Sequence, residues 1–568
     1  MYCILRKFAS NFYTLKKLFF TIICLLILSN TSIFAQDKIK IIHTDFTDRN
    51  QKDIPGAAVL LAGNVQVEHN GSKIWCNKAY ILENENYLKA FGDVRFNQGD
   101  TLHMNSEYAE YNGNKNFAYA SGKVVMRSPD MTLSTDTIYF DRNKQEAYYN
   151  SYGTIVSGEN TLKSKSGRFY ANQKKYQFLT AVTLTNPKYV LKSNHLDYYT
   201  NSGHAYVFGP STITSKENYI YTENGFYDTK KNFAHLLDNS YIKNDTQIIR
   251  GDSIYYDRNR DFSSATNNVK VTDTVNKFIA KGHYAEVYKK QDSLFLTKRA
   301  QVITLVEKDS LYTHAKQIVI TGKEGERIVR GYNNARFYKV DMSGKCDSIH
   351  SSEKTGLTQL IGRPVIWNGE SQLTGDVMHL ISDTKTEKLD SLKVLNNAFV
   401  IQLDTISARK NPSNPNFNQV KGLNLYGKFK DNKLHIVDLI KNTEKILYNY
   451  DKEDLIGIDK SKSSKIRMIF ENNELVNAIS YTNVDGTTYP EKDFPENVKK
   501  FRGFEWRGDE RIKRKEDIFP PEEQELHEQI VKESEEKKKE EIKPMEVLQE
   551  TLDYDKNNPK PKPPVIKE

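Results

Sequence analysis

The chain has 568 residues, of which 38% are hydrophobic, 11% aromatic and 27% charged. That much apolar material excludes a wholly disordered chain. The formal net charge is +9, but residues 1–35 hold four cations and no acid, so the remainder carries only +5. A long chain with so small an excess is not an obvious polyanion binder.

Residues 1–35 are typical of a secretory signal peptide. Lys16 and Lys17 precede an apolar run over residues 18–28, and a polar stretch then ends at Ala35. Because a bilayer-spanning helix needs about 20 residues, an uncleaved anchor is the less favoured alternative. We expect cleavage after Ala35 and an exported protein.

Two cysteines, Cys76 and Cys346, remain after this cleavage. They could pair, since export leads to an oxidising compartment. The alternative is two unrelated, partly buried residues, and the absence of a spacing pattern favours it.

The dominant feature is an internal repeat. Aromatic pairs recur in similar segments with successive steps of 29, 30, 29, 28 and 29 residues. The anchor positions are Tyr111, Phe140, Tyr170, Tyr199, Tyr227 and Tyr256, and a weaker copy ends at Tyr288. Polar clusters that begin at Asp141, Asp228 and Asp257 follow their anchors and predict turns, because Asp and Asn accept backbone hydrogen bonds there. We interpret the aromatic stripe as a structural ladder on a sheet, with a lipid-facing wall as the alternative.

A second strand-like segment lies about a dozen residues beyond each anchor and alternates with period two. Glycines such as Gly63, Gly92 and Gly122 precede several copies and predict a tight corner at strand entry. The alternation places one apolar set on a common face, and its members are Val65, Val67, Val94, Phe96, Val124, Met126, Val182, Leu184, Val269 and Val271.

These patterns predict an all-β fold, an elongated twisted β-roll of stacked repeats over residues 36–340. One repeat cannot bury its apolar face, but stacked repeats share a continuous interior. If each repeat adds one strand to each of two facing sheets, the stack grows by roughly 4.8 Å per repeat. Beyond it, short strand-like segments separated by Asn, Asp and Gly predict a second all-β domain over residues 341–506.

Residues 507–568 differ sharply in composition, with 32 charged residues of 62 and a net charge of −4. Their only aromatics are Phe519 and Tyr554, which is too little apolar surface to fold alone. We therefore expect a charged, proline-containing, disordered or partly helical tail that the fold does not need; a partner-binding tail is the alternative.

The sequence predicts no enzyme, no cofactor and no metal site. Twelve histidines are scattered without a metal-ligand pair. The recurrent turn aspartates could suggest calcium, but a calcium site needs several converging oxygens. Aromatics beside cations could suggest single-stranded nucleic acid, which export makes a weak hypothesis. A polysaccharide-cleaving β-helix would need an acid and base cluster that the sequence does not reveal.

Three segments carry a resemblance to a known family, and a fourth, Ala120-Ser-Gly-Lys-Val124, continues them. The three are Ala62-Gly-Asn-Val65-Gln-Val, Trp75-Cys-Asn-Lys-Ala-Tyr80 and Ala90-Phe-Gly-Asp-Val94-Arg-Phe. Here the chain resembles the OstA-like family, which includes LptA and the amino-terminal domain of LptD. Its two-part length, with Asn416-Phe-Asn-Gln419-Val-Lys-Gly422, is similar to the larger OstA-like proteins of Bacteroidetes-type bacteria.

The resemblance implies an open β-jellyroll in the periplasm whose trough carries the acyl chains of lipopolysaccharide toward the outer membrane. It implies that the ten alternating residues above face lipid. It also implies partners among the lipopolysaccharide-transport proteins of both membranes, and head-to-tail self-association through exposed end strands. A structural or adhesive β-solenoid without lipid is the alternative, distinguished by a filled rather than an open interior.

Overall fold

The computed structural model describes most of the chain between residues 38 and 540. The described ranges are 38–49 and 58–540, apart from residues 70, 99–101, 130, 188, 200, 217, 229, 245–246, 258, 276–277, 307–308, 387, 431–432 and 472–473. The predicted signal peptide and residues 541–568 of the predicted tail lie outside them. No helix of the described ranges is both long and apolar enough to cross a membrane.

The chain divides into two compact units. Unit 1 comprises Met1–Ile279 and Tyr284–Leu294, and unit 2 comprises Ala280–His283 and Phe295–Glu568. The predicted boundary near residue 340 lies within unit 2.

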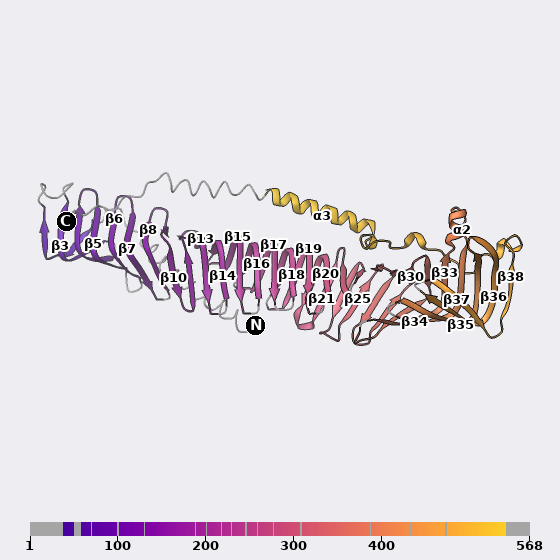
Figure 1. The fold of residues 1–568 in the computed structure, drawn as a ribbon. Helices are drawn as coiled ribbons and strands as arrows, with labels where there is room; N and C mark the ends of the chain where they lie inside the picture. Colours follow the sequence, from indigo (N-terminus) through magenta and orange to yellow (C-terminus); the bar gives the residue numbers. More distant parts are fainter. Residues whose placement is uncertain are drawn as a thin grey trace. The chain divides into compact units, whose positions relative to one another are not determined.

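The described residues of unit 1 form antiparallel strands, drawn from indigo to magenta in Figure 1, and one 3-10 turn, η2 (Lys289–Gln291). Strands β20 and β21 contribute residues to both units. The strands are β1 (Lys40–His43), β2 (Phe46–Asp48), β3 (Val59–His69), β4 (Ser72–Leu82), β5 (Tyr87–Gln98), β6 (Leu102–Asn112), β7 (Phe117–Ser128), β8 (Met131–Asp141), β9 (Glu146–Tyr149), β10 (Gly153–Ser157), β11 (Asn160–Ser164), β12 (Ser166–Tyr170), β13 (Lys175–Asn186), β14 (Tyr189–Tyr199), β15 (His204–Ser215), β16 (Asn218–Asp228), β17 (Phe233–Asn244), β18 (Gln247–Asp257), β19 (Phe262–Asp273), β20 (Phe278–Tyr288) and β21 (Ser293–Thr297).

Unit 2 is also built mainly of antiparallel strands, and it contains helices α2 (Thr405–Lys410) and α3 (Pro521–Glu540), the latter drawn in yellow. Its strands are β22 (Gln301–Val306), β23 (Asp309–His314), β24 (Gln317–Thr321), β25 (Ile328–Tyr332), β26 (Ala335–Lys339), β27 (Met342–Cys346), β28 (Ser348–Ser352), β29 (Leu357–Ile361), β30 (Val365–Asn368), β31 (Ser371–Thr374), β32 (Val377–Ser382), β33 (Leu389–Leu403), β34 (Phe417–Lys430), β35 (Lys433–Asp451), β36 (Asp454–Glu471), β37 (Glu474–Tyr481) and β38 (Asp485–Tyr489). Four 3-10 turns follow, η3 (Glu491–Asp493), η4 (Glu496–Val498), η5 (Gly508–Glu510) and η6 (Lys515–Ile518). The predicted all-β roll of stacked repeats is confirmed.

Most strands of unit 1 bend in the middle. In β3, Gly63 and Asn64 both have positive φ, and the pairing with β4 shifts register between Ala62 and Val65. Equivalent left-handed pairs, such as Asn267 and Asn268 in β19, recur in alternate strands. Gly and Asn tolerate this conformation at low cost. The glycines predicted to precede a strand therefore lie inside one, because a two-residue bend and a turn share the same residue preferences.

This bend corrects the predicted growth of the stack. One repeat is a hairpin of two long strands, and each strand crosses both layers, so a repeat adds two strands to each layer instead of one. The repeat β5–β6, for example, pairs Leu88 with Tyr111 on one side of the bend and Phe96 with Met104 on the other. At the usual strand spacing, one repeat lengthens the roll by about 9.6 Å.

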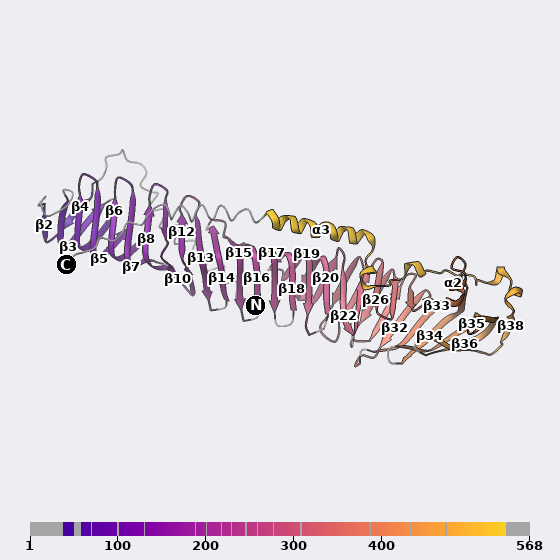
Figure 2. The same ribbon diagram turned by 45° about the horizontal axis from the view of Figure 1, so that its top comes forward.

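The bend divides each strand into two arms. We call arm 1 the layer that contains Leu61 and Ala90, and arm 2 the layer that contains Val65 and Val94; the corner is the line of bends between them (Figure 2). Apolar side chains of both arms form one buried cluster. The two arms therefore face each other across an apolar interior; we call the side opposite the corner, where the strand tips of both arms lie, the mouth.

The predicted turn clusters are confirmed. The Asp141 carboxylate accepts a backbone hydrogen bond from Lys144 at 3.0 Å. The Asp228 carboxylate accepts two, from Lys230 and Lys231, each at 2.9 Å. These aspartates are thus turn formers whose oxygens already have partners.

Residues 490–520, which include the end of the predicted second domain and the first part of the predicted tail, pack on unit 2; the tail thus buries some apolar surface, although its composition predicts too little to fold alone. We call residues 490–520 the strap. Phe501 and Phe494 belong to a buried cluster with Phe417 and Ile446. Further along, Ile518 is completely buried and Ile512 almost so. Composition missed these contacts because a few isolated apolar side chains pack on strands distant in sequence.

Two buried glutamines hold the strap. Gln372 donates to the Glu505 carbonyl at 2.8 Å and accepts from the Arg507 N–H at 2.7 Å. Gln419 donates to the Lys499 carbonyl at 2.7 Å and accepts from the Phe501 N–H at 3.0 Å. Each amide side chain thus satisfies one donor and one acceptor of a backbone that has no β-partner.

Candidate functional site

The interior of unit 1 is the candidate site, and arm 2 supplies one of its walls. Nine of the ten residues proposed from alternation are buried there, while Phe96 is half-buried. Val65, Val94 and Val124 lie next to the corner with exposed fractions of 0–1%. Phe96 and Met126 lie two residues further along β5 and β7, closer to the mouth.

Arm 1 supplies the opposite wall, and an aromatic row lies on it near the mouth. Its aromatic members recur every 29 residues, and cross-strand neighbours between them are often alanines, such as Ala118, Ala147, Ala205 and Ala234. The inward aromatics are Tyr111, Phe140, Phe169, Tyr198, Tyr227 and Tyr256. The wall therefore carries a ring on alternate strands over most of its length, and Tyr176 on β13 adds a further ring between Phe169 and Tyr198.

This row shows which aromatic of each pair faces the interior. Two predicted anchors, Tyr170 and Tyr199, point outward, and their neighbours Phe169 and Tyr198 point inward instead, with exposed fractions of 8% and 3%. The even period of 29 residues could have revealed this, because only the inward residues keep it throughout.

Small polar side chains line the inner side of the corner. Ser193 and Ser211 are buried and lie 2.8 Å apart, and Ser211 donates to the carbonyl of Gly209 in the bend. Thr222 likewise donates to Leu237 at 3.0 Å. These hydroxyls give hydrogen-bond partners to backbone carbonyls at the bend, where the pairing of the strands shifts register.

Tyr149 fills part of this interior. Its ring is 3% exposed and its hydroxyl lies 2.7 Å from Ser164 Oγ. The ring fits only because Gly153 and Gly167 lack a Cβ, which would lie 2.4 and 2.5 Å from it. The long strands are divided into β9–β12 at this point, so the interior is locally filled.

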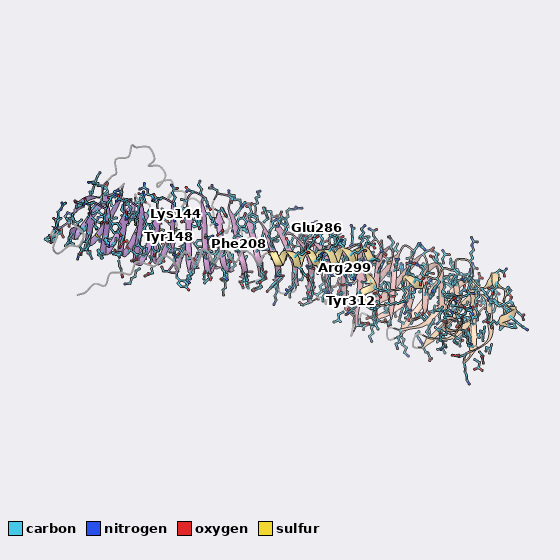
Figure 3. The ribbon with its side chains drawn as sticks, turned by 90° about the horizontal axis from the view of Figure 1, so that it is seen from above. Lys144, Tyr148, Phe208, Glu286, Arg299 and Tyr312 are labelled. Carbon is cyan, nitrogen blue, oxygen red and sulfur yellow. The ribbon has the colours of Figure 1, made fainter. Side chains whose placement is uncertain are left out.

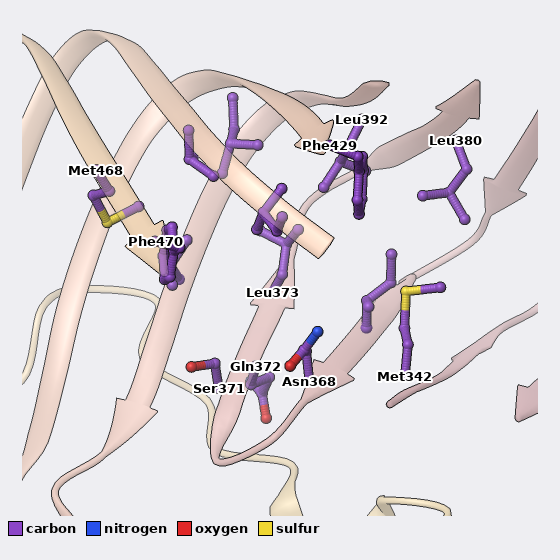
Figure 4. A pocket seen from close by; sticks show the side chains of 15 residues that line it. Met342, Asn368, Ser371, Gln372, Leu373, Leu380, Leu392, Phe429, Met468 and Phe470 are labelled. Carbon is purple, nitrogen blue, oxygen red and sulfur yellow. The ribbon is translucent and has the colours of Figure 1, made fainter. Parts of the chain in front are cut away.

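Unit 2 holds a cavity of about 70 Å³ between its own arms (Figure 4). Leu373 and Ile366 line it from one arm, and Met468 and Phe470 from the other. Its few polar lining side chains include Ser371. Sequence reasoning assigned no site residue here, because strand alternation in unit 2 does not distinguish a filled interior from one with a void.

The outer face of arm 1 carries a second aromatic row. Tyr139 and Tyr148 stack with ring centroids 4.9 Å apart, and the Arg168 guanidinium lies 4.8 Å from the Tyr148 ring. Figure 3 labels Tyr148 and Phe208 of this face. Because each ring packs against the next, this outer row is a structural ladder; of the predicted anchors only Tyr170 and Tyr199 lie on this face, and the other four face the interior.

Groups for chemistry are scarce in the described ranges. Cys76 and Cys346 are free and buried. Burial raises the pKa of Cys76 to about 11 and that of Cys346 to about 12, so both thiols are unreactive at neutral pH. No three His, Cys, Asp or Glu side chains among the described residues are placed to hold a metal ion.

Comparison with known proteins gives one family match. Residues 36–194 match a family model described as OstA-like protein. Among solved structures, the chain is similar to LptH of Pseudomonas aeruginosa, described as the LptA-homologous periplasmic component of the lipopolysaccharide transport device. The identity is 12%, the match covers 17% of this chain and 76% of that chain, and the TM-score is 0.16, too low to carry an argument. No curated protein matches the chain.

Proposed function

Because residues 36–194 belong to the OstA-like protein family, we propose that this chain binds lipopolysaccharide and relays it toward the outer membrane. The acyl chains lie in the groove between arms 1 and 2 of unit 1. The protein acts in the periplasm and catalyses no reaction. The energy for directional movement comes from other proteins.

The observation that supports this proposal is the apolar lining of the groove, which both arms supply in every repeat. Near the mouth, Phe96, Tyr111 and Phe140 are only partly buried while they pack against the core. An acyl chain laid along them would cover this surface, and each buried methylene contributes about 0.8 kcal/mol. Several chains would therefore bind firmly without a charged or catalytic group.

Terminal strands support the proposed partners, namely other lipopolysaccharide-transport proteins and further copies of this chain. In unit 1, β1 and β2 end the ladder and expose Ile42 and Phe46 by 50% and 55%. In unit 2, β37 and β38 end it, with Val476 exposed by 59%. Unpaired strand edges with apolar side chains are suited to pairing with another chain.

One observation favours a structural or adhesive β-solenoid as the second candidate. The valines next to the corner are almost fully buried without a ligand, and Tyr149 fills the interior between β8 and β12. A solenoid with a packed interior needs no lipid. The two candidates differ in what contacts the residues near the mouth.

Site-specific photocrosslinking in cells tests the proposal. A photoreactive residue in place of Phe96, at the mouth, should capture lipopolysaccharide, and one in place of Arg95, on the opposite face of β5, should capture much less. The matched pair on β7 is Met126 and Val125. Equal capture from both faces, or none from either while the protein remains folded, would contradict a lipid-binding groove.

A further inference from the structure

The outer face of arm 2 in unit 1 has a charge that the whole-chain composition conceals. Cross-strand registers from β3 to β19 define two outward rows on this face, one through Arg95 and Lys192 and one through Arg127 and Lys243. The rows hold eight lysines and arginines and a single acid, Glu68.

Arg95 on this face pairs with Asp93 at 3.0 Å, but four of its lysines lack the neutralisation found on arm 1. On the outer face of arm 1, Lys175 pairs with Asp197 at 2.6 Å and Arg168 with Glu146 at 3.5 Å. On arm 2, Lys163, Lys192, Lys243 and Lys270 are all exposed, and none makes an ion pair with a described residue. Arm 2 therefore presents uncompensated positive charge to solvent.

Three tyrosines lie among these cations. The Tyr241 ring stacks with Tyr221 at 5.3 Å and with Tyr219 at 5.9 Å. Arg250 lies 4.6 Å above the Tyr241 ring. The nearby carboxylate of Glu223, at the corner, accepts a hydrogen bond from the Tyr221 hydroxyl at 3.0 Å. We call these rings with Lys192, Lys243, Arg250 and Lys270 the basic tyrosine patch.

We propose that the basic tyrosine patch binds an anionic saccharide, namely the phosphate- or carboxylate-bearing sugar portion of the glycolipid whose acyl chains lie in the groove. This inference rests on the proposed function. Aromatic rings present flat apolar surfaces to sugar rings, and flanking ammonium and guanidinium groups attract the anionic substituents.

The geometry favours a flexible chain over a bilayer surface. The two rows follow strands that are each rotated by about 20–25° relative to the next, so a flat membrane would contact only a short part of this face. A flexible saccharide can follow the twist. The stacked rings also distinguish the patch from a purely electrostatic one, in which aromatic side chains would have no role.

The patch is within reach of the groove. Tyr219 lies near the start of β16 and Lys243 near the end of β17, and both of these strand ends lie at the tip of arm 2. A sugar chain attached to lipid in the mouth needs to pass only over this tip to reach the outer face. A single glycolipid would then contact both faces of arm 2, with its acyl chains on the inner face and its sugar chain on the outer face.

Binding is tested with the full chain and a saccharide that carries no acyl chains. The probe is a fluorescently labelled, phosphorylated oligosaccharide from completely deacylated lipopolysaccharide, with neutral dextran as its control. We expect binding by fluorescence anisotropy at low ionic strength that weakens as salt is added, because exposed charges are screened. Dextran should bind at least about tenfold more weakly.

Two charge-reversal variants locate the site. Lys192→Glu/Lys243→Glu/Lys270→Glu changes the patch, and Lys115→Glu/Lys144→Glu/Lys231→Glu changes the net charge equally at exposed turns of arm 1. The patch variant should lose about tenfold or more in affinity and the control little. In addition, Tyr241→Ser should weaken binding of the oligosaccharide more than that of inorganic polyphosphate.

Several outcomes would overturn the inference. Equal losses in the two triple variants would mean that net charge alone acts, and an unaffected patch variant would place the saccharide elsewhere. Tighter binding to vesicles containing phosphatidylglycerol than to the oligosaccharide would indicate a membrane surface. Crosslinking of lipopolysaccharide from Phe96 reports the groove separately, so capture there without oligosaccharide binding would refute the patch and leave the proposed function intact.

Discussion

Val124 and Val125 are adjacent on β7, and a carboxylate placed at each tests the two faces of arm 2. Val124 is 1% exposed within the core, whereas Val125 is half-buried on the outer face between Asn105 and Ser134. Val124→Asp loses about 1.5–3 kcal/mol of apolar burial. Keeping the introduced carboxyl protonated at pH 7, about 3 units above its ordinary pKa, costs roughly 4 kcal/mol more.

Together these terms predict that Val124→Asp lowers the free energy of unfolding by about 6 kcal/mol at pH 7. Burial raises the folded-state pKa of the introduced carboxyl above its unfolded value, so the protonation cost is absent below about pH 4 and grows as pH rises. The loss at pH 5 should therefore be smaller by about 2.7 kcal/mol than at pH 7. Val125→Asp should cost little and show almost no such pH dependence.

Urea unfolding of the full chain, followed by far-ultraviolet circular dichroism at pH 5 and pH 7, measures both quantities. Hydrogen exchange of peptides from β7 and β8 reports whether the effect is local. Similar losses for the two variants, or a Val124→Asp loss independent of pH, would show that the strand register or the apolar interior is described wrongly.

Three other predictions concern packing. Gly167→Ala should destabilise unit 1 by about 1–3 kcal/mol in urea unfolding, because the new Cβ would lie 2.5 Å from the Tyr149 ring. Gly251→Ala is the control and should have a smaller effect, since its nearest contact would lie at 3.3 Å. A maleimide at pH 7.5 should label neither Cys76 nor Cys346 in the folded chain and both in urea, as read by mass spectrometry; rapid labelling of the native protein would contradict the raised thiol pKa values. A chain that ends after Trp506 should unfold at a lower temperature than one that ends after Glu540, because it loses the buried Ile512 and Ile518; identical melting would mean that these contacts do not stabilise unit 2.

Local sequence patterns were sufficient to predict most of the fold of unit 1. Alternation in Val65-Gln-Val67 and its copies predicts which residues lie inside, because a strand has only two faces and the apolar one must be covered. The turns followed from Asp and Asn placed after each aromatic pair. Both signals arise within a few residues of sequence.

Features that depend on distant contacts could not be predicted in this way. Gln372 and Gln419 lie in the sheet and bind the backbone of the strap, which follows more than 75 residues further along the chain. Gly167 is needed because of a ring that another strand provides. The charge asymmetry between the outer faces appears only when register places lysines from many repeats in the same two rows.

The two-strand repeat has a consequence for how such a chain can change in length. Only alternate strands bend through a left-handed pair, so a single inserted strand would reverse the chain direction and put a bend where its neighbours have none. A whole hairpin of 29 residues restores direction, bend and inward face together. Gene segments that encode one hairpin are therefore the smallest units whose duplication or deletion leaves every remaining residue in its environment, and the length of the groove can vary only in steps of two strands.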